Sequence, residues 1–160
     1  MRERGMPATK PIEFGLGEME LGSAAINPEW ILEGDPVARN KFLFKSADGM
    51  ATTWLWDCTA GKFNWFYDID ETVYVIEGSI IIKDHAGGIS NVNAGETIFF
   101  PAGSSAEWTV PNYVRKFAIL RAPLPRQVQF AKRVYHSLKR LARGGHGGDE
   151  DAAPKMFQGG

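Results

Sequence analysis

The run from Gly61 to Glu71 contains three side chains whose chemistry suits a small-molecule site. Trp65 and Tyr67 are two residues apart, so on a β-strand they lie on the same face. Glu71 follows four residues after Tyr67. Aromatic walls with a few polar groups are typical of small-ligand pockets, and a buried glutamate beside a cation can act as a general acid or base. The run therefore predicts a ligand pocket or a catalytic site.

The elements that must position these residues are short β-strands. Between residues 41 and 121, segments rich in Val, Ile, Phe and Trp alternate with turn residues, which is typical of a sandwich or barrel. We expect strands at residues 41–45, 51–58, 63–67, 72–77, 79–83, 89–92, 97–100, 107–110 and 115–121. No helical pattern interrupts this series, which excludes βαβ folds. The predicted fold is all-β, a single jelly-roll β-barrel over residues 26–125.

The segments that flank the predicted barrel differ from it in composition. Residues 1–25 are interpreted as an N-terminal arm, and residues 144–160, rich in Gly, Asp and Ala, as a disordered tail. Residues 126–143 place apolar side chains at a spacing of 3.6 and carry six Lys/Arg without an acid. They predict a basic, C-terminal amphipathic α-helix. We expect it to pack on the barrel or on a partner in a homodimer, with an anionic membrane surface as the alternative.

The bulk composition narrows the function classes. A chain of 160 residues with 44% hydrophobic residues predicts one globular domain, and the lone Cys58 excludes an internal disulfide. No apolar run reaches the roughly 18 residues that span a bilayer. The expected location is cytoplasmic, and the alternative is peripheral attachment to a membrane through residues 126–143. Six charges on one helix are not a nucleic-acid reading motif, so no nucleic-acid partner is expected.

The spacing of the motif glycines resembles the cupin superfamily. In the first cupin motif a glycine leads into a strand carrying His-x-His, then a Glu four residues on, then a Gly that closes the next hairpin. Gly61, Glu71 and Gly78 match this frame, while Trp65 and Tyr67 stand at the histidine positions.

The second cupin motif is also present, from Gly95 to Pro101-Ala102-Gly103, with Ala106 at the position of the expected histidine. Residues 56–71 and 74–78, together with Trp108 and the pair Arg115-Lys116, resemble one branch of small cupins. That branch contains the (S)-ureidoglycine aminohydrolase-like and the ethanolamine-utilisation cupins. The resemblance covers roughly residues 30–121 and implies a single cupin jelly roll.

If Trp65 and Tyr67 take the histidine positions, strand alternation directs both into the barrel. Glu71 then points inward from the next strand, and Trp108 points inward from the second motif. The expected ligand-binding residues are Trp56, Trp65, Tyr67, Glu71, Trp108 and Lys116. If the site is catalytic, Glu71 serves as acid or base, Lys116 as charge stabiliser and Tyr67 as hydrogen-bond donor.

No metal ligands and no cofactor are expected, because the frame offers one carboxylate and one phenol but no imidazole. The alternative is a weakly bound divalent cation at Glu71, helped by a carboxylate such as that of Glu107.

Three functions remain open on the sequence alone. The first is binding of a small metabolite inside the barrel without the histidine metal ligands. The second is a lyase, isomerase or amidohydrolase that acts on a small nitrogenous or sugar-derived substrate with Glu71 and Lys116. The third is a non-catalytic structural or sensing module tethered by its basic helix. In this last case Glu71 and Lys116 form a structural ion pair inside a filled core.

Overall fold

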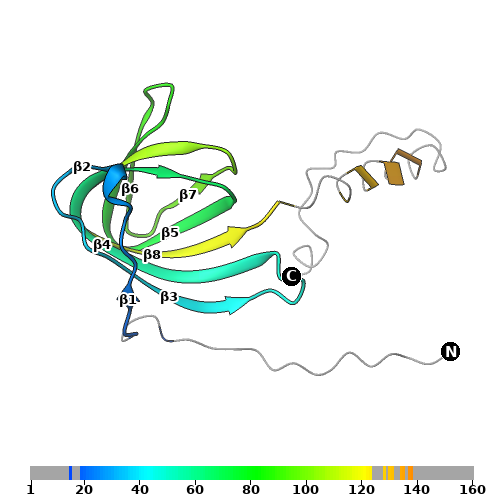
Figure 1. Cartoon of the computed structure of the whole chain (residues 1–160), viewed down its shortest axis with the longest axis horizontal. Helices are drawn as coiled ribbons and strands as arrows, with labels where there is room; N and C mark the ends of the chain where they lie inside the picture. Colours follow the sequence, from blue (N-terminus) through cyan, green and yellow to red (C-terminus); the bar gives the residue numbers. More distant parts are fainter. Residues whose placement is uncertain are drawn as a thin grey trace. The chain divides into compact units, whose positions relative to one another are not determined.

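The computed structural model describes residue 15, residues 19–123 and isolated positions of the following segment (128, 130, 131, 134, 135, 137 and 138). The chain divides into two compact units, Met1–Pro123 and Leu124–Gly160. The first unit is mostly β-strand (Figure 1). Residues 144–160, which were predicted to be disordered, and most of the N-terminal arm fall outside the described residues. The predicted helix over residues 126–143 is described only at isolated positions, so it stays a prediction.

The described strands form one antiparallel, eight-stranded sheet with the order β1-β3-β4-β8-β5-β6. In addition, β2 pairs with β4, and β7 pairs with β5. A 3₁₀ turn, η1 (Pro28–Trp30), precedes β2. The strand bounds are β1 (Gly22–Ser23), β2 (Ile31–Glu33), β3 (Ala38–Lys45), β4 (Ala51–Phe66), β5 (Asp70–Lys83), β6 (Ile89–Asn93), β7 (Thr97–Phe100) and β8 (Ser105–Arg121).

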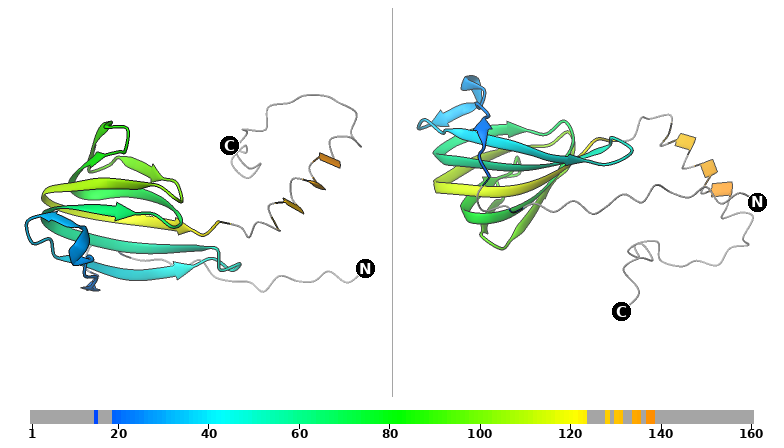
Figure 2. Two further views of the ribbon diagram at one scale, coloured as in Figure 1. Left: turned by 45° about the horizontal axis from the view of Figure 1, so that its top comes forward. Right: turned by 90° about the horizontal axis from the view of Figure 1, so that it is seen from below.

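Three long strands bend the sheet into two layers (Figure 2). Residues 51–59 of β4 pair with residues 113–121 of β8, and after a register shift residues 61–66 pair with 105–110. β5 changes register against β8 in the same way, between Gly78 and Ile81. The first layer contains β1, β3 and β7, and the second contains β2 and β6. Within the described residues the pairing does not join β1 to β6, so the sheet is strongly curved but not closed.

The motif glycines sit at these bends. Gly78 has a φ of +74°, and a Cβ there would collide with the carbonyl oxygen of Tyr113 on β8. A Cβ at Gly61 would lie 2.7 Å from the Cβ of Pro36. The expected strand breaks near residues 59–62, 78 and 111–114 are therefore wrong: the strands continue through them as bends. Glycine allows the close approach that the bends of β4 and β5 require.

The side chains between the two layers form the hydrophobic core. Val73, Val75 and Val114 of the first layer are fully buried with Phe63 and Ile80 of the second. The rest of this cluster consists of Ile26, Ala38, Trp56, Cys58, Tyr67, Ile82, Val92, Phe100, Ala106, Trp108 and Val110. Among the described residues no helix combines the length and the apolar character needed to cross a membrane.

Candidate functional site

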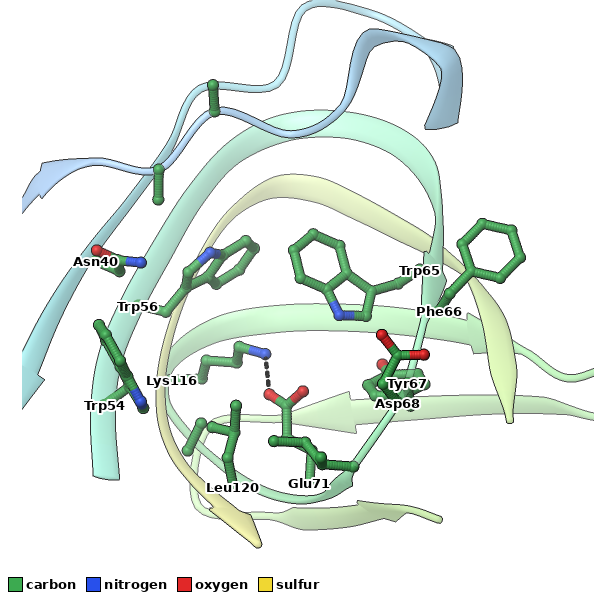
Figure 3. Close-up of a pocket in the computed structure, with 14 residues that line it drawn as sticks. Asn40, Trp54, Trp56, Trp65, Phe66, Tyr67, Asp68, Glu71, Lys116 and Leu120 are labelled. Carbon is green, nitrogen blue, oxygen red and sulfur yellow. Dashed lines mark hydrogen bonds and ion pairs between the residues drawn. The ribbon is translucent and has the colours of Figure 1, made fainter. Parts of the chain in front are cut away.

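One end of the space between the layers is open as a cavity of about 560 Å³ (Figure 3). Its walls come from β3, β4, β5 and β8 and from the segment that precedes η1. The lining residues are Ala24, Ala25, Asn40, Trp54, Trp56, Trp65, Phe66, Tyr67, Asp68, Ile69, Glu71, Lys116, Ala118 and Leu120. The space between the two layers therefore has two parts. Core side chains fill one part, and the cavity occupies the part at the open end.

A buried ion pair lies at the inner wall of the cavity. Lys116 Nζ donates to Glu71 Oε1 at 2.6 Å, and the two side chains are 5% and 8% exposed. Strand alternation explains why they meet. Glu71 shares the inner face of β5 with Val73 and Val75, and Lys116 lies opposite Val75 on β8. The ammonium group also lies 4.8 Å from the ring centroid of Trp56 and 4.7 Å from that of Trp108.

Tyr67 contributes a neutral phenol to the same wall. Its hydroxyl accepts a hydrogen bond from Trp108 Nε1 at 2.8 Å, and its ring stacks on Phe100 with centroids 4.3 Å apart. Burial raises the pKa of Tyr67 well above its ordinary value, and the negative charge of Glu71 raises it further, against the opposing effect of the Trp108 hydrogen bond. The phenol therefore keeps its proton and can serve as a hydrogen-bond group but not as a base.

Five of the expected ligand-binding residues line the cavity, and Trp108 does not. Trp108 is 1% exposed and lies in the core, where its ring stacks on Phe63 with centroids 6.0 Å apart. From its position in the core, Trp108 contacts two cavity residues: its N–H donates to the Tyr67 hydroxyl, and its ring lies beside the Lys116 ammonium group. Its inward direction was expected from strand alternation, which says nothing about depth between two layers.

The structure adds cavity residues that sequence reasoning missed. Trp54 shares the inner face of β4 with Trp56, and Asn40 lies opposite Trp56 on β3. The exposed Asp68, which follows Tyr67 directly, also lines the cavity. The parity of Trp54 with Trp56 was a usable signal, because the two are two residues apart. Asn40 and Asp68 carried no such signal, since their placement depends on pairing between strands and on a turn.

The donor set at the cupin metal position does not fit a transition metal. The positions that precede Glu71 hold an indole and a protonated phenol, and the ammonium group of Lys116 already lies 2.6 Å from the carboxylate. Within the described part of the chain, no group of three or more His, Cys, Asp or Glu side chains is placed to hold a metal ion.

The alternative cation site built from Glu71 and Glu107 is not formed. Glu107 pairs with Lys62 at 3.2 Å and lines a second, smaller pocket of about 230 Å³. That pocket also contains His85, whose Nε2 hydrogen-bonds Ser105 Oγ. The two glutamates therefore face different pockets.

Comparison with known proteins shows a likeness over the middle of the chain. Residues 45–118 match the family model of the EutQ-like cupin domain. Acetate kinase EutQ from Clostridioides difficile (strain 630) is 43% identical over 54 residues, which cover 33% of this chain and 33% of that protein. The match therefore spans about a third of the curated relative.

Solved structures of other proteins are also similar to parts of this chain. A protein of unknown function from Pseudomonas syringae pv. tomato is 26% identical with a TM-score of 0.61, over 66% of this chain and 46% of that chain. The EutQ protein of Clostridium difficile is 27% identical with a TM-score of 0.49, over 56% of this chain and 65% of that chain. Residues 45–118 contain the bends of β4, β5 and β8 and all three charged side chains of the cavity. Residues 45–118 of this chain therefore resemble the EutQ-like cupin domain.

Proposed function

We propose that this protein binds a small polar metabolite in the cavity beside Glu71, without a metal ion. The observation that carries the proposal is a buried ion pair placed against a cavity of about 560 Å³. Ligand pockets typically have volumes of roughly 300–1,000 Å³, apolar and aromatic walls, and a few polar groups. Trp54, Trp56 and Trp65 supply such walls here.

The ion pair has an energetic cost that ligand binding would explain. Removing two charges from water is expensive, and apolar side chains of similar volume often stabilise a core equally well or better. Glu71 and Lys116 are both nearly buried, yet both side chains line the cavity. A polar ligand that enters this space would supply partners to the carboxylate.

A screen of small polar metabolites tests this function. We expect at least one compound to raise the melting temperature of the full chain and to give ligand-observed NMR signals that Trp65→Ala abolishes. Phe99→Ala is the matched control, because Phe99 is an aromatic side chain that is 56% exposed and lies outside the cavity. Binding that is insensitive to Trp65→Ala, or no binding by any compound, contradicts the proposal.

Catalysis at the same site is the second candidate. The adjacency of the Glu71 carboxylate and a phenol that keeps its proton favours it, because a base and a hydrogen-bond donor then face one cavity. In this case Glu71 would accept a proton from the bound substrate. NMR spectra of each compound that binds, recorded over hours with the protein, test this candidate. Chemical conversion that Glu71→Gln abolishes while binding persists supports catalysis. Compounds that bind but are not converted support binding alone.

A further inference from the structure

We propose that the ligand is an organic ammonium ion, that is, a small protonated amine that binds between Glu71, Asp68 and the indole walls. The inference rests on the proposed function and specifies the chemical class that the cavity accepts. It follows from how the charges of the cavity are already partnered.

The ammonium group of Lys116 is engaged within the protein. A lysine ammonium has three N–H donors. One is directed to Glu71 Oε1, and the group also lies within 5 Å of the ring centroids of Trp56 and Trp108, where the negative faces of the indoles stabilise positive charge. Lys116 is therefore poorly placed to bind an anionic ligand, although it is the one cation among the described residues that line the cavity.

The groups that remain for the ligand are acceptors. The carboxylate of Glu71 has two oxygens, and Figure 3 shows the second one directed away from Lys116, toward the side of the cavity where Asp68 lies. The charged side chains in the lining are Asp68, Glu71 and Lys116, which sum to −1 (two negative charges and one positive). A cation entering this space is attracted, whereas a carboxylate or phosphate is repelled.

The aromatic walls favour a cation in the same way. Trp54 and Trp65 line the cavity beside Trp56. Trp54 Nε1 donates to Thr52 Oγ1 at 3.0 Å, so its N–H is partnered and its apolar ring remains for the ligand. Lys116 shows how the fold holds a primary ammonium, with a carboxylate on one side and indole rings around it. The cavity lining offers a ligand the same two kinds of group, namely carboxylates and indole rings.

A matched series of probes tests the charge preference directly. Benzylamine, benzyl alcohol and benzoate have similar sizes and differ in head-group charge at neutral pH, and each is small against a cavity of about 560 Å³. Titration of the full chain at low salt by calorimetry or ligand-observed NMR should rank them as amine, alcohol and carboxylate. We expect the amine to bind about tenfold more tightly than the alcohol, and benzoate to bind more weakly than either.

Two substitutions locate the binding charge. Asp68→Asn and Glu71→Gln should each weaken benzylamine binding several-fold, while affinity for benzyl alcohol changes little. Asp68 is exposed, so Asp68→Asn remains informative even if Glu71→Gln reduces stability. Glu29→Gln is the matched control: it removes the same charge from an exposed side chain outside the cavity.

The outcomes separate the ligand class from the proposed function. Preference for the amine that both cavity substitutions reduce supports the inference. Trp65-dependent binding of the alcohol or of benzoate at least as tight as that of the amine overturns the ammonium class but leaves metabolite binding intact. Metabolite hits without any amine binding overturn the class in the same way. If neither the probes nor the metabolites bind, both proposals fall.

Discussion

Glu71 and Asp57 are two buried carboxylates on opposite faces of the same sheet layer. Glu71 is 6% exposed on the inner face, and Asp57 is 1% exposed on the outer face, between the inward-facing Trp56 and Cys58. Each carboxylate lies 2.6 Å from a basic nitrogen. Pairing with a cation therefore does not distinguish them.

The two sites differ in what surrounds the pair. Asp57 Oδ1 accepts from Arg39 Nε at 3.0 Å, and Oδ2 accepts from Arg39 Nη2 at 2.6 Å and from the Tyr113 hydroxyl at 2.9 Å. Both oxygens are thus satisfied within the protein, and the hydrogen bond to Asp57 raises the pKa of Arg39. Glu71 instead faces a cavity. A carboxylate fully partnered by its own chain serves the fold, whereas one beside open space can also serve a ligand.

The largest effect is expected at the inner pair. Lys116→Met should lower the free energy of unfolding by about 3–5 kcal/mol, because it leaves Glu71 buried without its cation. Urea denaturation of the purified variant measures the loss. The double variant Glu71→Gln/Lys116→Met should regain most of it. A double variant as unstable as Lys116→Met would mean that the loss comes from packing around the lysine stem and not from charge.

A smaller effect is expected at the outer pair. Asp57→Asn should lower the free energy of unfolding by about 1–3 kcal/mol, because it weakens hydrogen bonds from Arg39 and Tyr113. The side chain of Arg39 is 49% exposed, so water can replace the lost acceptor. Ligand affinity in the cavity should stay unchanged in the same variant. A large fall in affinity would contradict the structural role assigned to Asp57.

The pKa of the Cys58 thiol depends on one member of each ion pair, Asp57 and Lys116. The pKa of this thiol is raised to about 12, mainly by burial and in part by the charge of Asp57, against the lowering effect of Lys116. Because the folded pKa lies above the ordinary value of 9.0, the stability linked to this thiol is complete below pH 9 and is lost as the pH rises toward about 12. The difference in unfolding free energy between the native chain and Cys58→Ala, measured across this range, isolates the linked part.

The substitutions Asp57→Asn and Lys116→Met should shift the pKa of the Cys58 thiol in opposite directions. Asp57→Asn should lower the pKa of the thiol, and Lys116→Met should raise it, each by less than the burial effect. The rate of thiol labelling against pH gives this pKa for the native chain and for both variants. Shifts in the same direction would show that structural loosening, and not charge, controls the thiol.

Strand alternation predicted which side chains line much of the candidate site. It has a period of two residues and needs only local information, so Trp65 with Tyr67, and Glu71 with Val73 and Val75, could be assigned to one face. The motif spacing added the likeness to cupins. Lys116 was also expected in the cavity, but the sequence did not settle which face of its strand it occupies. The residues selected in these two ways include Trp65, Glu71 and Lys116, which line the cavity in the structure.

What could not be predicted depends on contacts between distant strands. The depth of Trp108 is set by Phe63 and Phe100, which pack on it from other strands. The site at Asp57 was missed because Arg39 and Tyr113 are 18 and 56 residues away in sequence. A signal existed, since one acid within the buried run Leu55–Cys58 requires a partner. The sequence could not name that partner.

The bends of β4, β5 and β8 determine how the molecule can open. These strands have 16, 14 and 17 residues, and each contributes hydrogen bonds to both layers. One layer therefore cannot peel away without breaking ladders that continue into the other, and native-state hydrogen exchange should show both as one cooperative unit. The cavity is already open at one end, so a small molecule can enter it without separation of the two layers.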